Sequence, residues 1–140
     1  MPTKLFHGDL QFDNVIYGDG EFYLLDWRQD FAGSNVGDVY YDLAKMYGGI
    51  LMSYKLMKNN ENFSCFIDEN VVNYDYKNES NLTKFKPIYE NWIIDNNYDL
   101  DKVKSITALI FLNMSPLHEK EFGDMLFFKS KQMLQEINDK

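Results

Sequence analysis

The chain has 140 residues and a formal net charge of −8, with 45% apolar and 16% aromatic residues. This acidic balance argues against nucleic acid or an anionic membrane as a partner, because both bind basic surfaces. One cysteine, Cys65, excludes an intrachain disulfide and a cysteine-based zinc site. With no signal peptide or membrane-spanning run in the sequence, we expect a cytoplasmic protein that folds as one domain over residues 1–140.

The first part of the chain predicts short strands and loops. Lys4–Phe6 has room only for a short strand. Val15–Tyr17 and Phe22–Leu25 flank the stretch Gly18-Asp19-Gly20-Glu21, a pattern that predicts a β-hairpin with a glycine-containing turn. Asp26 would then stand at the end of the second strand.

The rest of the chain predicts mostly helices. Apolar residues spaced three and four apart indicate one helix over Asp38–Met57, followed by a polar loop. Phe63–Asp68 and Val71–Tyr76 predict a second hairpin. Three further helices are expected: over Leu82–Ile93, with Pro87 as a kink or a late start; from Asp99 as N-cap to Ser115-Pro116; and over Phe122–Ile137. The fold class expected is therefore α+β, mostly helical.

A group of polar residues near the start of the chain suits phosphoryl transfer. His7, Asp9 and Asn14 form the pattern H-x-D-x-x-x-x-N, and Asp26 follows across the predicted hairpin. Because a hairpin returns the chain to where it left, the side chains of Asn14 and Asp26 are expected to converge. Their oxygens suit Mg²⁺, which is usually shared with substrate phosphates. Asp9 would remain available to accept a proton from an attacking hydroxyl.

Several motifs together resemble one enzyme family. They are His7-Gly8-Asp9-Leu10, Asn14, Leu25-Asp26-Trp27, Gly37-Asp38 and Asp42-Leu43-Ala44. In this order they resemble the catalytic and metal-binding motifs of the aminoglycoside phosphotransferase and choline kinase family, kinase-like enzymes that phosphorylate small molecules.

The resemblance implies a role for each matching residue. Asp9 corresponds to the catalytic base, and Asn14 and Asp26 to the Mg²⁺ ligands that also bind the nucleotide, ATP. Asp42 corresponds to the buried carboxylate that braces the catalytic loop. His7 belongs to the catalytic motif, where the role of the histidine is chiefly structural.

The resemblance also implies a fold and a division of the chain. It covers residues 4–47, which would form the catalytic and metal-binding core, and leaves 48–140 as a helical region for the acceptor substrate. The implied fold is a kinase-like C-terminal lobe in which a short β-hairpin carries the catalytic and metal-binding loops. Because so few residues precede His7, we expect the N-terminal nucleotide-binding lobe to be absent, through truncation or separate encoding, and the chain alone to turn over little substrate.

The function expected is ATP-dependent transfer of a γ-phosphate to a hydroxyl of a small molecule, such as an amino alcohol, a sugar or an aminoglycoside. A cationic acceptor would suit Trp92, Glu90 and Asp95 through cation–π and charge contacts. The alternative is a non-catalytic remnant or small-ligand-binding module with the same fold. A metal-dependent phosphohydrolase fits less well, because such sites gather more His and Asp than this chain supplies.

Overall fold

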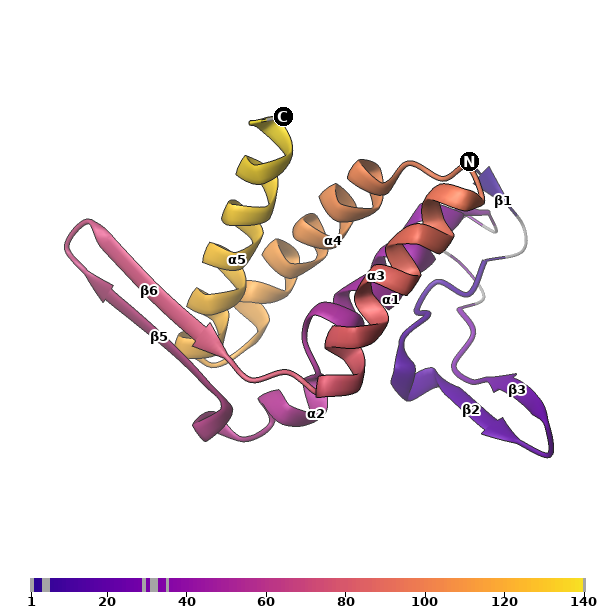
Figure 1. The fold of residues 1–140 in the computed structure, drawn as a ribbon, viewed down its shortest axis with the longest axis horizontal. Coiled ribbons are helices and arrows are strands. Elements are labelled where there is room, and N and C mark those ends of the chain that lie inside the picture. Colours follow the sequence, from indigo (N-terminus) through magenta and orange to yellow (C-terminus); the bar gives the residue numbers. More distant parts are fainter. Residues whose placement is uncertain (1, 4–5, 29, 31–32, 35, 140) are drawn as a thin grey trace.

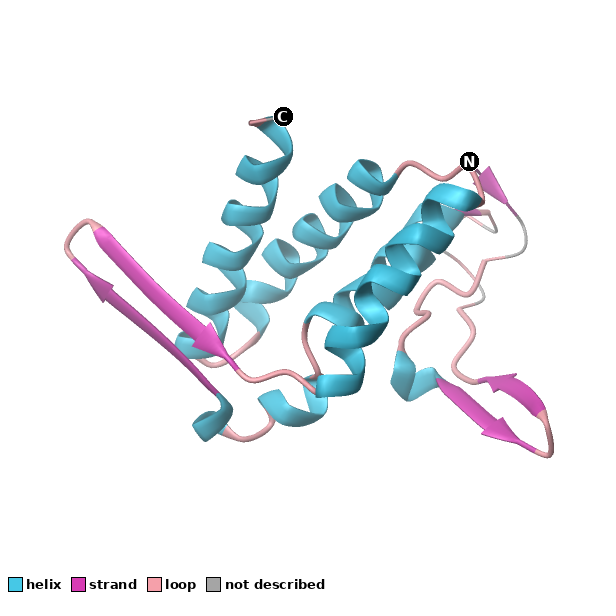
Figure 2. Cartoon of the chain, viewed as in Figure 1, coloured by secondary structure: helices cyan, strands magenta, loops and turns pink. Residues whose placement is uncertain are grey.

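The computed structural model describes residues 2–3, 6–28, 30, 33–34 and 36–139. Over these residues the chain forms five α-helices and three antiparallel strand pairs, which confirms the prediction of a mostly helical α+β fold. Two hairpins project to opposite sides of the helices in the view of Figure 1, and Figure 2 shows the helices as the bulk of the chain.

The elements follow one another from the head of the chain to its last helix. The helices are α1 Val39–Leu51, α2 Tyr54–Met57, α3 Ser80–Asp95, α4 Leu100–Met114 and α5 Lys120–Asn138. The strands are β1 Pro2–Thr3, β2 Val15–Gly18, β3 Glu21–Leu24, β4 Gly37–Asp38, β5 Phe63–Asp68 and β6 Val71–Tyr76. Short 3-10 turns are η1 Phe12–Asn14, η2 Asn60–Asn62 and η3 Ser115–Leu117. β1 pairs with β4, β2 with β3, and β5 with β6.

Both predicted hairpins are confirmed. In the turn between β2 and β3, Asp19 and Gly20 have φ of 52° and 82°, and two left-handed residues in succession are the hallmark of a type I′ hairpin turn. The second hairpin, β5–β6, has the predicted bounds. Of the predicted strand at Lys4–Phe6, Lys4 and Leu5 lie outside the described residues and Phe6 belongs to no strand.

The prediction of one helix over Asp38–Met57 is wrong, because α1 ends at Leu51 and α2 is separate. The side chain of Asn78 ends the helix: its Nδ2 donates to the carbonyls of Ile50, at 2.9 Å, and Leu51, at 3.1 Å. Its Oδ1 accepts from the amide of Ser53 at 3.2 Å. These bonds satisfy groups that a helix end leaves open, and they come from a residue far along the chain.

The three later helices are present, with one difference. α3 begins at Ser80 and runs through Pro87, so the proline does not mark a late start. Pro87 is exposed, and the backbone carbonyl that loses its helical partner can bond to water instead. The Asp99 N-cap is confirmed, because its carboxylate accepts from the amide of Lys102 at 3.0 Å.

The core lies among α1, α3, α4 and α5, which we call the helical body. Its fully buried side chains include Tyr47, Ile93, Val103, Phe111 and Leu126. Gly48 of α1 faces α4, where a Cβ would make an ordinary van der Waals contact with the ring of Phe111 at 3.4 Å. In the described part of the chain, no helix is both long and apolar enough to cross a membrane.

Candidate active site

The loop that carries Asp9 is anchored to α1 by Asp42. The two carboxylate oxygens of Asp42 accept hydrogen bonds from the amides of His7, at 2.6 Å, and Gly8, at 2.8 Å. Asp42 is 6% exposed, so these are buried bonds to a charged acceptor, a strong class of hydrogen bond. Gly8 has φ of 80°, and a Cβ on it would lie 2.8 Å from the Cβ of Arg28. The backbone before Asp9 therefore requires both the glycine and the carboxylate.

Asp9 is held from two sides. Its Oδ1 lies 2.8 Å from the Nζ of Lys45, and these side chains are 20% and 15% exposed, respectively. Its Oδ2 accepts from the Asn14 amide at 3.4 Å and from Gln11 at 3.5 Å, both long contacts. The Lys45 ion pair is thus the strongest contact of the carboxylate.

Sequence reasoning did not single out Lys45. It lies three residues after Asp42 on α1, and residues at that spacing share one face of a helix. The same face of α1 therefore anchors the loop backbone through Asp42 and orients Asp9 through Lys45. The spacing was the signal that could have found it.

Asn14 ties the far end of the loop back to Asp9. It is buried, and its Nδ2 donates to the backbone carbonyl of Asp9 at 2.9 Å. Because the amide nitrogen is used in this way, the amide oxygen is the atom that Asn14 can present to a cation.

Asp26 stands in a bend next to this loop. Before it, the amide of Leu25 donates to the carbonyl of Asn14 at 2.8 Å; after it, the amide of Arg28 donates to the carbonyl of His7 at 2.9 Å. Asp26 itself is exposed and has a left-handed backbone, with φ of 53°. The hairpin therefore returns the backbone beside Asn14 and leaves the Asp26 carboxylate open to solvent.

The donor set is compatible with a shared Mg²⁺ site. In the described part of the chain, no three His, Cys, Asp or Glu side chains gather into a group that could hold a metal by themselves. Mg²⁺ rarely needs such a cage, because it commonly binds one or two protein carboxylates and completes its shell with water and substrate phosphates. The amide oxygen of Asn14 and the carboxylate of Asp26 fit this incomplete set.

His7 makes structural contacts. It is 3% exposed, its Nδ1 accepts from the amide of Asp9 at 3.2 Å, and its ring centroid lies 5.5 Å from that of Trp27. Its Nε2 is buried and has no hydrogen-bond partner among the described residues. The histidine thus packs between the loop and the segment that follows the hairpin.

The three residues expected to recognise a cation all lie on α3 and make different contacts. Glu90 accepts from the Tyr47 hydroxyl at 2.6 Å and pairs with Lys104 at 3.1 Å. Burial raises the pKa of Glu90, but the Tyr47 hydroxyl and the Lys104 ammonium outweigh it and leave the pKa lowered. Trp92 stacks on tyrosine rings, and Asp95 is exposed at the end of α3. Glu90 thus serves the packing of α3 on its neighbours.

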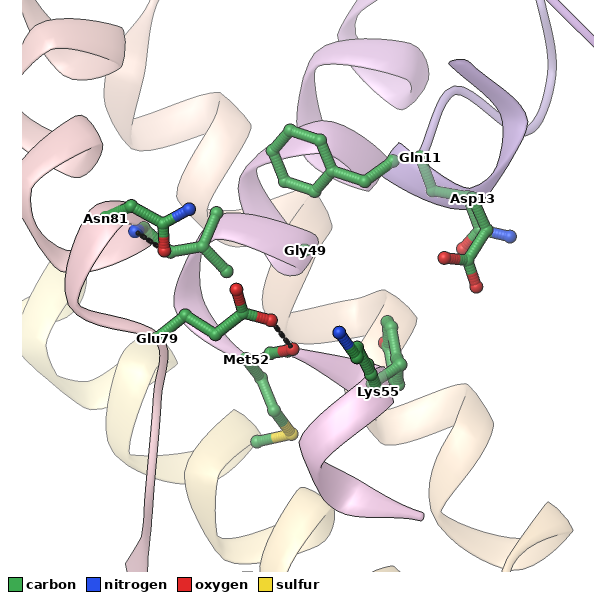
Figure 3. Close-up of a pocket in the computed structure, with 11 residues that line it drawn as sticks. Gln11, Asp13, Gly49, Met52, Lys55, Glu79 and Asn81 are labelled. Carbon is green, nitrogen blue, oxygen red and sulfur yellow. Dashed lines mark hydrogen bonds between the residues drawn. The ribbon is translucent and has the colours of Figure 1, made fainter. Parts of the chain in front are cut away.

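A cavity of about 280 Å³ lies on the Gln11 side of the loop. Figure 3 shows Gln11 and Asp13 on one wall, with Glu79 and Asn81 on the other. Glu79 accepts from the Ser53 hydroxyl at 2.8 Å. With Lys55 also in its lining, this cavity carries both signs of charge.

A larger groove, of about 440 Å³, lies on the Lys45 side of the loop and includes Arg28 in its lining. Gln11 and Lys45, which both contact Asp9, thus each line one of the two hollows. Comparisons of the chain with protein-family models, with curated proteins and with solved structures found no match in any of the three.

Proposed function

We propose that this chain is a kinase-like C-terminal lobe of a small-molecule phosphotransferase, which transfers the γ-phosphate of ATP to a hydroxyl group. One observation carries the proposal: buried Asp42 holds the amides of His7 and Gly8 while Asn14 bonds to the carbonyl of Asp9. Phosphoryl transfer depends mainly on positioning and charge, so a rigid loop that presents one carboxylate and one amide oxygen suits it.

The chemistry assigns a role to each side chain. Asp9 accepts the proton of the acceptor hydroxyl while the oxygen of that hydroxyl forms a bond to the γ-phosphorus of ATP. The bond from that phosphorus to the β–γ bridging oxygen breaks, and ADP leaves with the electron pair. Lys45 keeps the Asp9 carboxylate in one orientation. Asn14 and Asp26 would hold Mg²⁺, which when bound neutralises charge on the phosphates.

The β2–β3 hairpin supports the proposal of a partner lobe. Its exposed side chains include Tyr17 and Phe22, which are 67% and 72% exposed, and Trp27 follows it at 51%. Apolar surface gathered in this way commonly marks an interaction site. We propose that a second lobe, which supplies the remaining nucleotide contacts, covers this hairpin.

Trp27 offers a direct test, because it follows Asp26 in the chain. In a Trp92→Phe background, Mg²⁺ and then Mg-ATP are titrated while the fluorescence of Trp27 is followed. We expect a saturable change that Asp26→Asn abolishes. Asparagine tolerates a left-handed backbone well, so this variant removes the charge and keeps the bend.

The outcomes separate the proposal from its alternative. No change with millimolar Mg-ATP would contradict a nucleotide site beside Asp26, and an unaltered change in Asp26→Asn would place the metal elsewhere. Saturable binding without transfer to any hydroxyl compound, even with a nucleotide-binding lobe added, would favour a non-catalytic ligand-binding module.

A further inference from the structure

The groove beside Lys45 is connected to the candidate base through that lysine. Lys45 lines it, and the Nζ of the same residue lies 2.8 Å from Asp9. Along α4 the lining is mostly apolar, with Ile106, Leu109, Ile110 and Met114 and one polar residue, Asn113. Asp9 is not among the lining residues, so a molecule in the groove would have a largely aliphatic wall beside it and would reach Asp9 past Lys45.

The charge of this groove is opposite to that of the protein. Arg28 and Lys45 both line it, and none of the described lining residues is Asp or Glu, although the chain carries a net charge of −8. No carboxylate in the described part of the chain forms an ion pair with Arg28, whereas Lys45 is paired with Asp9. The guanidinium is thus the cation left to bind a ligand, and its planar fork suits a carboxylate or phosphate.

The backbone places this cation next to the loop that carries the base. The Arg28 side chain lies over Gly8, where a Cβ would be 2.8 Å from the Cβ of Arg28 and 3.1 Å from its Cδ. Gly8 directly precedes Asp9, and consecutive Cα atoms are about 3.8 Å apart. One small molecule could therefore place an anionic group at Arg28 and a hydroxyl toward Asp9, because both side chains extend from this short stretch of backbone contact.

We propose that the acceptor is a hydroxy acid: a molecule with an anionic group close to the reacting hydroxyl and an aliphatic tail along α4. This inference rests on the proposed function, which makes Asp9 the base. Transfer would turn the hydroxyl into a phosphate monoester, with its proton on Asp9 and ADP as the leaving group. The cavity of Figure 3, with Asp13 and Glu79 in its lining, is where a cationic acceptor would bind instead.

Three six-carbon probes that differ at one end test the proposal: 2-hydroxyhexanoate, 1-amino-2-hexanol and neutral 1,2-hexanediol. Each is titrated into the whole chain without nucleotide, and the backbone amide shifts are followed by NMR. We expect 2-hydroxyhexanoate to perturb amides of α4 and to bind about fivefold more tightly than the diol, as one solvent-accessible ion pair allows. The amino alcohol should bind most weakly.

Matched variants locate the binding. Arg28→Gln should lower the affinity for 2-hydroxyhexanoate about fivefold and leave that for the diol unchanged. Lys55→Gln, in the other cavity, removes the same charge from the protein and should change neither. Equal affinity for all three probes, preference for the amino alcohol, or shifts confined to the cavity of Figure 3 would overturn the proposal.

The probe titration tests the acceptor class and the Trp27 titration tests the nucleotide site, so either can fail without the other. Arg28-dependent binding of the hydroxy acid with no response of Trp27 to Mg-ATP would establish the anion site and contradict the proposed nucleotide site beside Asp26. A response of Trp27 without selective binding of the hydroxy acid would leave the phosphotransferase proposal standing and refute this class of acceptor.

Discussion

The helical body and the head of the chain, residues 6–28, are held by different forces. In the body, side chains such as Phe111, Met125 and Leu126 are completely buried. The head is anchored to α1 by polar contacts, from Asp42 to the loop backbone and from Lys45 to Asp9. Burial of a large apolar side chain stabilises by about 1.5–3 kcal/mol, and a hydrogen bond to a charged group contributes a similar amount, but the body buries many such side chains and the head has few such bonds. Stability therefore resides mainly in the body, and the geometry of the candidate site in the polar anchors.

The β2–β3 hairpin shows the same difference between the head and the helical body, because its apolar side chains are not buried. Ile16, Tyr17, Phe22 and Tyr23 are exposed, so the apolar side chains of the hairpin add little to the core. Substitutions in the head should thus alter the site while the body stays folded. Changes in the body should lower the stability of the whole chain.

The largest effect is expected in the body. Phe111→Ala should lower the free energy of unfolding by about 3–5 kcal/mol, because it leaves a cavity among α1, α4 and α5. Leu109→Ala is the matched control: this residue lies on the same helix and is 53% exposed, so its loss should cost about 0.5 kcal/mol or less. Urea unfolding followed by circular dichroism measures both. An equal loss of unfolding free energy in the two variants would contradict the expectation that the buried position contributes more than the exposed one.

The next effect is expected at the anchor of the head. Asp42→Asn keeps the shape but sets an NH₂ group against one of two buried amides, at a cost of about 1–3 kcal/mol. Hydrogen exchange should show faster exchange at His7 and Gly8 and unchanged protection in the middle of α4. Asp99→Asn makes the same chemical change at a helix N-cap, where asparagine is accepted equally well, and should have little effect. Unaltered exchange at His7 would show that Asp42 does not anchor the loop.

The smallest effect concerns the pH dependence of the body. Because the Tyr47 and Lys104 contacts hold the pKa of Glu90 below its ordinary value of 4.5, its charged form stabilises the fold above that pH. This stabilisation is lost as the pH falls below 4.5 and through the lower pKa of the folded state. Glu90→Gln should cost less than about 1 kcal/mol at neutral pH and flatten the decline of unfolding free energy in acid. An unchanged slope would show that Glu90 does not contribute to acid sensitivity.

The candidate site was predictable where its residues are neighbours or are joined by a local hairpin. Asp9 and Asn14 share one short loop, and the turn at Asp19-Gly20 brings the chain back so that Leu25 bonds to Asn14. Distant partners were not predictable in the same way. The Asp42 contact was expected only from the resemblance to a family, and the Lys45 contact was not expected at all.

The sequence by itself determined the local features. Two left-handed residues at Asp19-Gly20 set the first hairpin, alternating β-rich runs set β5–β6, and the Asp99 carboxylate starts α4. Each depends on residues a few positions apart, whose preferences act before the chain is compact.

Only the tertiary structure decided where α1 ends and what surrounds Asp9. Asn78 caps the helix at Leu51, and Lys45 pairs with Asp9. These contacts join residues far apart in the chain, and they form only when burial of the helical body has brought those segments together. No local pattern encodes them, because their energy depends on the packed neighbours rather than on the residues next in sequence.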